Sequence, residues 1–365
     1  MEKAILIGIK LPASKLEAVE EHLLELGALA DTAGAKVAAS VIQKLQKLNS
    51  ATLIGEGKVL EIAELLKAND AHLVVFDEDL SGSQVRNLEE LLPDVKVLDR
   101  TALILDIFAR HAKTAESRLM VEIAQMQYMY PRLTNAWTHL SRQATGGTPG
   151  IGMRGPGEKQ LEVDRRLVKK RILELKSKLK KIEQGRNIQA KNREGIFHIG
   201  IVGYTNAGKS TLVNRLTNAG VLAENKLFAT LDSTTRRLFL SEGVSVLVSD
   251  TVGFIRKLPH HLMETFKSTL SVASTANCIL EVVDSTSCDY EEQIAVTAKT
   301  LEQLVSPFVP HLLVFNKIDR ISEEQLSAIG ERYPNALKIS SQNGTGIAEL
   351  KQKLLALQGE WKVTH

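Results

Sequence analysis

The chain has 365 residues, more than one ordinary hydrophobic core uses, so we expect two or three domains. Hydrophobic residues make up 44% and charged residues 24%, which excludes disordered, collagenous and disulfide-rich classes. Two cysteines cannot build a disulfide framework, and neither a signal peptide nor an apolar run of membrane-spanning length is present. We therefore expect a cytoplasmic protein, with a peripheral location at membranes as the alternative.

Residues 1–118 alternate short apolar runs with amphipathic stretches. The runs lie near 4–9, 36–42, 72–76 and 95–98, and the helical patterns between them near 14–27, 57–68 and 83–92. This alternation predicts an N-terminal α/β domain with a small parallel or mixed sheet. Gly55-Glu56-Gly57-Lys58 opens one of the helices, and we interpret it as a glycine turn, with a second nucleotide site as the alternative.

A change of period marks residues 119–194. Apolar residues recur at alternating steps of four and three, which predicts an antiparallel helical hairpin in which Pro131 kinks the first helix without ending it. The seams are Leu119, Ile123, Met126, Tyr130, Leu133, Trp137 and Leu140, then Leu161, Val168, Ile172, Leu175, Leu179 and Ile182. The loop 141–157 holds six glycines and two prolines, so we expect a mobile tip, or else a plain linker.

The formal net charge of +3 is unevenly distributed along the chain. Residues 142–193 hold fifteen Lys/Arg and five Asp/Glu, a net +10, which leaves −7 for the rest. Such a face attracts polyanions, and RNA is the candidate we favour. Since this segment has no aromatic residue, phosphate contacts and shape are expected to dominate over base stacking. An acidic membrane surface and a cationic face without a ligand are the alternatives.

From residue 195 to 365 the pattern is that of a P-loop domain with a mostly parallel, doubly wound sheet. The strand 196–203 runs into a GxxxxGK[ST] loop and a helix. Loop N–H groups can surround a phosphate, Lys209 supplies a charge to the β- and γ-phosphates, and Ser210 can ligate Mg²⁺. The predicted contacts are Gly203, Tyr204, Thr205, Asn206, Ala207, Gly208, Lys209, Ser210 and Thr211.

Later strands end in residues that select the ligand. Asp250 and Gly253, with Thr251 and Val252 between them, offer an acid for Mg²⁺ and an N–H for the γ-phosphate. The carboxylate of Asp319 can accept both the N1–H and the 2-amino group of guanine, whereas adenine would leave it unpaired. The same loop holds Asn316, Lys317 and Ile318, and a further loop holds Ser340, Ser341 and Gln342, where an N–H can reach guanine O6. GTP or GDP with Mg²⁺ is therefore the predicted ligand.

The segment 227–237 should supply a threonine that senses the γ-phosphate and completes the Mg²⁺ shell. Thr230, Thr234 and Thr235 all have the chemistry for it, and their spacing does not choose among them.

These motifs together resemble the HflX family of ribosome-associated, translation-factor-like GTPases. The resemblance covers nearly the whole chain and rests on 203–211, 228–236, 250–255, 316–319 and above all 146–166. It implies that Thr230 is the Mg²⁺-linked threonine beside Ser210, and that Lys209, Thr230 and Gly253 are catalytic. It also adds Phe228, Ala229, Leu231 and Asp232 to the nucleotide contacts.

The resemblance implies a partner as well. It indicates binding to the large ribosomal subunit, with ribosomal RNA held by the basic hairpin 142–193, and a role in translation, in ribosome splitting or rescue under stress, or in ribosome biogenesis. Two departures from the family are Ser341 and Gln342, which replace Ala and Lys. Some members carry a further C-terminal domain, which we do not expect after the last helix near 346–357.

The sequence also bears on mechanism. Phe254 follows the DxxG glycine, where many GTPases place a water-orienting glutamine, so we expect slow intrinsic hydrolysis that ribosomes stimulate. Alternatively, Phe254 only packs the switch and another residue, such as His260 or His261, acts in cis. We expect a monomer. The alternative functions are a P-loop kinase of a small acceptor and a GTP-regulated coiled-coil protein-interaction module.

Overall fold

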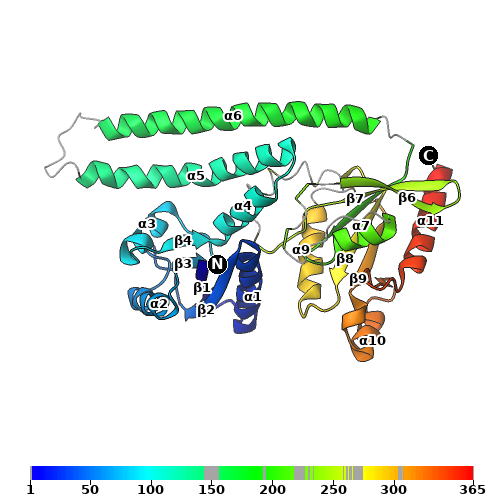
Figure 1. Cartoon of the computed structure of the whole chain (residues 1–365), viewed down its shortest axis with the longest axis horizontal. Coiled ribbons are helices and arrows are strands. Elements are labelled where there is room, and N and C mark those ends of the chain that lie inside the picture. The colour runs from blue at the N-terminus through cyan, green and yellow to red at the C-terminus, as the bar shows by residue number, and fades with distance from the viewer. Residues whose placement is uncertain are drawn as a thin grey trace. The chain divides into compact units, whose positions relative to one another are not determined.

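The computed structural model (Figure 1) describes residues 2–143, 156–191, 195–217, 227–228, 231–232, 234–257, 274–302 and 308–364, with the single positions 259, 262, 265 and 306. Contacts between Cα atoms group the chain into two compact units. The first is 1–110 with 118–180, and the second is 111–117 with 181–365. The boundaries at 118 and 194 stay predictions, and most of the predicted loop 141–157 lies outside the described residues.

The first unit contains a four-stranded parallel sheet in the order β2-β1-β3-β4. Its strands are β1 (Glu2–Lys10), β2 (Ala35–Lys44), β3 (Leu73–Phe76) and β4 (Lys96–Asp99), and its connecting helices are α1 (Leu16–Thr32), α2 (Glu56–Asn69) and α3 (Gly82–Leu91). The central strand β1 is buried over six consecutive residues because helices lie on both faces. The predicted α/β domain is confirmed, and its sheet is wholly parallel.

Helix α4 (Arg100–His111) follows β4 and was not predicted. Seven of its twelve residues are buried, and Leu103, Ile104, Ile107 and Phe108 recur at helical spacing, so the sequence did hold a signal for this helix.

The helical hairpin consists of α5 (Ala115–Gln143) and α6 (Pro156–Lys191), which lie side by side in Figure 1. Pro131 lies inside α5 without ending it, as predicted. Leu175 and Leu179 of the α6 seam are buried, and the Arg171 guanidinium donates to Glu122 Oε1 at 2.8 Å. The antiparallel hairpin is therefore confirmed. The helices also take up residues 141–143 and 156–157, so they extend into the predicted loop.

Helix α5 is buried beyond its seam because a second face contacts the sheet of the same unit. Asp99, at the end of β4, is fully buried and accepts hydrogen bonds from the Tyr128 hydroxyl at 2.8 Å and from Arg132 Nη2 at 2.6 Å. It also accepts the backbone N–H groups of Leu80 and Ala102. A fully bonded buried carboxylate of this kind fixes the helix to the sheet.

The second unit contains a six-stranded sheet in the order β10-β9-β8-β5-β7-β6. Its strands are β5 (His198–Gly203), β6 (Thr234–Ser241), β7 (Val244–Asp250), β8 (Cys278–Asp284), β9 (His311–Asn316) and β10 (Leu337–Lys338). Only the edge strand β6 is antiparallel, so the sheet is mostly parallel as predicted. The strands β6 and β8 were not predicted.

The helices of this unit are α7 (Lys209–Thr217), α9 (Tyr290–Leu301), α10 (Glu323–Arg332) and α11 (Ile347–Thr364), with a 3₁₀ turn η1 (Ile318–Arg320). The main core joins α7 and α11 to one face of the sheet, through residues such as Leu212, Leu280 and Leu350. No helix in the described parts of the chain is long and apolar enough to cross a membrane.

Candidate functional site

The predicted P-loop is the turn between β5 and α7. A side chain at Gly203, where φ is +141°, would collide with the carbonyl oxygen of Val282. A side chain at Gly208, where φ is +90°, would collide with the amide nitrogen of Asn316. Only glycine adopts these angles at such close approach. The close approach of β8 and of Asn316 therefore leaves room only for glycine at positions 203 and 208. A tight phosphate-binding turn needs glycines of this kind.

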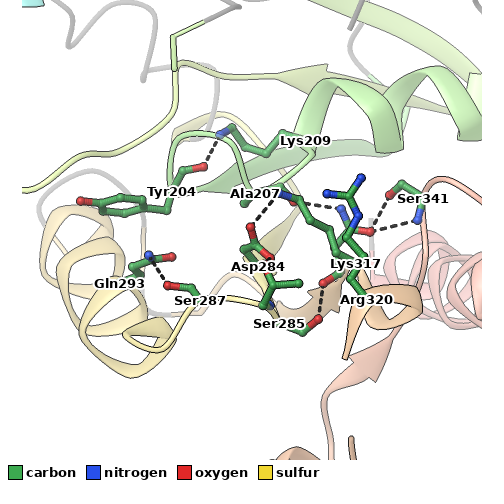
Figure 2. Close-up of polar contacts among 12 residues, drawn as sticks. Tyr204, Ala207, Lys209, Asp284, Ser285, Ser287, Gln293, Lys317, Arg320 and Ser341 are labelled. Carbon is green, nitrogen blue, oxygen red and sulfur yellow. Dashed lines mark hydrogen bonds and ion pairs between the residues drawn. The ribbon is translucent and has the colours of Figure 1, made fainter. Parts of the chain in front are cut away.

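Lys209 begins α7 inside this turn. It is only 7% exposed, and its Nζ donates to the carbonyl oxygen of Tyr204 at 2.7 Å (Figure 2). Burial lowers the pKa of Lys209 to about 8; the Asp250 carboxylate opposes this effect and the Lys317 ammonium adds to it. A buried cation with a lowered pKa is stabilised further by an anion, which makes Lys209 suited to a phosphate.

The next residue, Ser210, is the predicted Mg²⁺ ligand. Ser210 Oγ lies 2.7 Å from Asp250 Oδ2, although the two residues are 40 positions apart. Asp250 ends β7 and is 2% exposed. A hydroxyl and a carboxylate oxygen at the carboxyl edge of a parallel sheet are the donors that Mg²⁺ takes beside phosphates, so this pair fits that ion.

The predicted base-recognition loop is tied to the P-loop by Asn316. Its side-chain amide donates to the carbonyl oxygen of Ala207 at 2.9 Å, and its Oδ1 accepts both the N–H and the hydroxyl of Ser341 at 2.9 Å (Figure 2). Its own carbonyl oxygen accepts the Ser285 hydroxyl at 2.7 Å. One buried asparagine thus joins three of the predicted loops, and it brings Asp319 and the 340–342 loop to the side of the P-loop.

Two further residues of this region are held in place. Lys317 has a left-handed backbone with φ +67°, and its Nζ lies 2.6 Å from Asp284 Oδ2. Gln342 acts as an acceptor in both of its described hydrogen bonds. Its backbone carbonyl oxygen accepts from Arg215 at 2.6 Å, and its side-chain Oε1 accepts from Arg320 at 3.3 Å. The Gln342 side chain is therefore held by Arg320, whereas the Arg215 bond goes to the backbone and does not depend on the side chain.

The DTVGF segment pairs directly with the P-loop. The N–H of Phe254 donates to the Gly203 carbonyl oxygen at 3.1 Å, and the N–H of Thr205 donates to the Phe254 carbonyl oxygen at 2.8 Å. The Phe254 side chain is 3% exposed. A Cβ added to Gly253 would lie 2.8 Å from Lys209 Nζ, so this glycine lies directly against the lysine.

Beyond this pairing, the P-loop tyrosine contacts the end of the segment. The Tyr204 hydroxyl accepts the N–H of Arg256 at 2.7 Å, and the Arg256 guanidinium lies 3.0 Å from Asp289 and 3.2 Å from Glu292. Arg256 is 5% exposed, so these carboxylates compensate a buried charge.

The segment 227–237 is only partly described. Leu227, Phe228 and Leu231 are buried, and Asp232 is half-buried. Ala229 and Thr230 lie outside the described residues, as do His260 and His261, so their predicted roles stay predictions. In the β6–β7 ladder Thr234 lies opposite Asp250 and Thr235 opposite Ser249, and the Thr235 and Ser249 hydroxyls share a hydrogen bond at 2.7 Å.

Family models match the chain in three consecutive segments. The model described as "GTP-binding GTPase N-terminal" matches residues 20–109, and "GTP-binding GTPase Middle Region" matches 111–193. The model described as "50S ribosome-binding GTPase" matches 198–317.

Curated relatives are similar to nearly the whole chain. GTPase HflX of Caldanaerobacter subterraneus subsp. tengcongensis is 46% identical over 97% of this chain and 80% of its own length. GTPase HflX of Escherichia coli K12 is 43% identical over 98% and 84%, and that of Flavobacterium psychrophilum 41% over 100% and 92%. The chain belongs to the HflX family of GTPases. This HflX-family protein is therefore a GTPase that binds GTP and GDP with Mg²⁺ and hydrolyses GTP, and its family is one of ribosome-associated GTPases.

Solved structures agree with the fold of the HflX-family chain. The GDP complex of the GTP-binding protein SsGBP is 24% identical over 99% of both chains, with a TM-score of 0.54. A GTP-binding protein of the archaeon Sulfolobus solfataricus, also in complex with GDP, is 24% identical over 99% of this chain and 100% of its own, with a TM-score of 0.50.

The structure brings the predicted P-loop, Asp250–Gly253, Asn316–Asp319 and Ser340–Gln342 to one edge of the second sheet. Sequence reasoning missed Asp284, which ends the unpredicted strand β8, and the bond from Tyr204 to Arg256. The available signal for Asp284 was weak, since the apolar residues 278–280 and 282–283 that precede it are interrupted by Glu281. No sequence signal marks the tyrosine bond, because it depends on a backbone N–H.

Proposed function

We propose that this HflX-family GTPase associates with the large ribosomal subunit through its first unit and its hairpin, in a manner that depends on the bound nucleotide. The activity would serve translation, ribosome splitting or rescue under stress, or ribosome biogenesis. The observation that carries the proposal is the charge of α6. A cytoplasmic, monomeric protein is the form in which we expect it to act.

Over residues 165–181 the exposed charged side chains of α6 are almost all basic, and Leu167 and Leu173 are exposed among them. Glu174 is the one exposed acid among the described side chains of this stretch. The exposed basic residues are Arg166, Lys169, Lys170, Lys176, Lys178, Lys180 and Lys181. Because the buried residues Leu175 and Leu179 are used in the hairpin, the lysines are left to solvent or to a polyanion. Ribosomal RNA is the polyanion that the family description favours.

Roles within the GTP site follow from the geometry. Lys209, buried and beside Gly253, would face the β- and γ-phosphates, while the N–H of Gly253 meets the γ-phosphate. Ser210 and Asp250 would hold Mg²⁺, with Thr230 as the third protein group. When bound, this ion neutralises charge that develops on the phosphates. Asp319, which is 20% exposed, would accept the guanine N1–H and 2-amino group.

Phe254 bears on the hydrolysis rate. Its ring is buried and its backbone is paired with the P-loop on both sides, so it packs the segment and does not orient water. We infer that intrinsic hydrolysis is slow and that ribosomes stimulate it by ordering or supplying a polar group. Steady-state hydrolysis with and without large subunits tests this inference, and equal rates would contradict it.

Coupling between nucleotide and hairpin has a physical route. Residues 111–117 belong to the second unit, and they comprise the end of α4, the linker 112–114 and the first turn of α5. Lys113 and Thr114 of this linker hydrogen-bond to Asp232, in the segment that we expect to respond to the γ-phosphate. A change in that segment would therefore act on the first residues of the hairpin.

Cosedimentation with large subunits tests the proposal. A triple variant, Lys176→Gln, Lys178→Gln and Lys180→Gln, should weaken binding and make it less sensitive to salt, since each lost phosphate contact reduces the salt slope by about 0.7–0.9. The matched control changes three exposed lysines of the second unit, Lys299, Lys353 and Lys362, and should bind normally. Binding should also differ between GDP and a non-hydrolysable GTP analogue.

Two outcomes would contradict the proposal. If affinity is the same in both nucleotide states, the nucleotide does not control association. If the α6 variant binds subunits like the control, or if binding is insensitive to salt, the hairpin is an apolar protein-interaction module instead.

A further inference from the structure

The end of β8 carries an acid to which no role has been assigned. Asp284 is its last residue, opposite Asn316 of β9, and β8 lies between β5 and β9. The carboxyl edge of the sheet thus places Asp284 between the P-loop and the base-recognition loop. Figure 2 shows its side chain pointing at Lys317.

Both carboxylate oxygens of Asp284 have partners. Oδ2 lies 2.6 Å from Lys317 Nζ, and both side chains are only 16% exposed. Oδ1 accepts the N–H of Thr286 at 3.0 Å and its hydroxyl at 2.7 Å. The threonine therefore sets the orientation of the carboxylate, which then offers its second oxygen to the lysine. A charge-assisted hydrogen bond of this length between two largely buried side chains is stronger than an ion pair at the exposed surface.

Lys317 is held at three points. Its backbone has the left-handed φ of +67°, which a lysine rarely adopts, and the bonds of Asn316 on both its side chain and carbonyl oxygen keep that conformation. Its Cε lies 4.0 Å from the position of a Cβ on Gly208, so the stem runs beside the P-loop. Asp284 fixes the Nζ end of the Lys317 side chain. A free lysine stem would have many rotamers to lose on binding a ligand.

We propose that Asp284 is a positioning residue for guanine nucleotides, which acts by holding the Lys317 stem against the P-loop in the place where it covers the face of the base. The inference rests on the proposed role of the 316–319 loop. Asp284 orders the lysine before the nucleotide arrives, and this preorganisation raises affinity. Because the stem covers the face and not the edge of the base, Asp284 affects affinity without affecting the choice of base.

A double-mutant cycle on nucleotide affinity tests the proposal. GDP dissociation constants are measured for the full chain, Asp284→Asn, Lys317→Met and the double variant. Asp284→Asn should weaken GDP about tenfold, but less than twofold once Lys317 is methionine. Thr286→Val should give a smaller loss. Glu291→Gln, which breaks a similar pair with Arg332 at the surface of the same unit, is the control and should bind like the parent.

A second readout separates positioning from a general structural role. Affinity for inosine diphosphate, which lacks the 2-amino group, should fall in Asp284→Asn by the same factor as affinity for GDP. Equal losses in the parent and Lys317→Met backgrounds, or a changed ratio between the two nucleotides, would overturn the proposal. So would GDP affinity within twofold of the parent.

A different experiment tests whether the 316–319 loop binds the base at all. If the 316–319 loop binds the base, Asp319→Asn should change the preference of the protein from guanine to xanthine nucleotides. If that variant keeps its preference for GDP, the loop assignment is wrong. If it changes preference while Asp284→Asn binds normally, only the inference about Asp284 is wrong.

Discussion

The Thr114 hydroxyl donates a hydrogen bond to Asp232 Oδ1 at 2.7 Å across 118 positions of the chain. The same hydroxyl accepts the N–H of Ser117 at 3.1 Å and so caps the start of α5. Asp232 Oδ2 accepts the N–H groups of Lys113 and Thr114. One carboxylate in the segment expected to sense the γ-phosphate therefore holds the first turn of the hairpin.

Asp232→Ala should loosen this turn. It removes the acceptor of three hydrogen bonds, so we expect the free energy of local opening at 113–117 to fall by about 1–2 kcal/mol. Amide hydrogen exchange in the GDP state and with a GTP analogue measures it, and the difference between the two states should shrink in the variant. Glu242→Ala, at an exposed acid in the turn after β6, is the control. Unchanged protection of Lys113 and Thr114 would contradict the coupling.

Nucleotide affinity should depend on pH through Lys209. Its pKa of about 8 means that the nucleotide-free protein loses this proton as the pH rises above 8. Phosphates bind the protonated form, so affinity for GDP should fall up to tenfold per pH unit above 8. Calorimetry at pH 8.5 in two buffers of different ionisation enthalpy should show proton uptake on binding. Constant affinity from pH 7 to 9.5 would rule this out.

The same group affects the stability of the nucleotide-free protein with a definite sign. Its ordinary pKa is 10.5, so between pH 8 and 10.5 the unfolded chain holds a proton that the native chain has lost. The contribution of Lys209 to the free energy of unfolding is therefore lowest below pH 8 and rises across that window.

Asp319→Asn should change the base that is bound. An amide can accept the N1–H of xanthine and donate to its 2-oxo group, whereas it repels the 2-amino group of guanine. GDP affinity should fall by about two orders of magnitude, and xanthosine diphosphate should bind in its place. Competition against a labelled nucleotide measures both. Weak binding of both nucleotides would mean that the loop has lost its fold.

Tyr204→Phe should release the segment after Phe254. The N–H of Arg256 loses its hydroxyl acceptor in a buried place, at a cost of about 1–3 kcal/mol. Hydrogen exchange at Arg256 should accelerate accordingly, while Tyr333→Phe, in the core cluster around Phe315, should leave that amide unchanged. Slow exchange at Arg256 in the Tyr204 variant would show that the bond does not hold the segment.

Asp99→Asn should destabilise the first unit. The change breaks a buried ion pair with Arg132 and places an amide where four donors converge, so the free energy of unfolding should fall by about 3 kcal/mol. Denaturant titration of the full chain measures the loss. GDP affinity, which depends on the second unit, should stay at the parental value. A parallel loss of GDP binding would show that the two units do not unfold separately.

The loops of the GTP site could be predicted because each follows an apolar strand and contains side chains of recognisable chemistry. Lys209, Asp250 and Asp319 were found in this way. Asp284 was not, because its strand contains the charged Glu281 in the middle of the apolar run and no known motif follows it. The role of Asp284 depends on Lys317, which the fold places beside it.

Secondary structure was missed for related reasons. Strand β6 is exposed on much of both faces, so it lacks the alternation by which a half-buried strand is detected. Helix α4 was missed although its apolar residues Leu103, Ile104, Ile107 and Phe108 recur at helical spacing. The hydrogen bonds of Asp232 to the linker could not be predicted, since they join segments with no shared pattern.

The membership of 111–117 in the second unit affects how the chain can be made and divided. During synthesis, Lys113 and Thr114 leave the ribosome long before Asp232, and residues 118–180 of the first unit are made in the interval. The second unit therefore closes through a contact of high sequence separation, which tends to form late. A fragment that begins at Gly195 would lack part of its own folding unit, so biochemical work on the GTPase portion alone should supply residues 111–117 as a peptide or retain the whole chain.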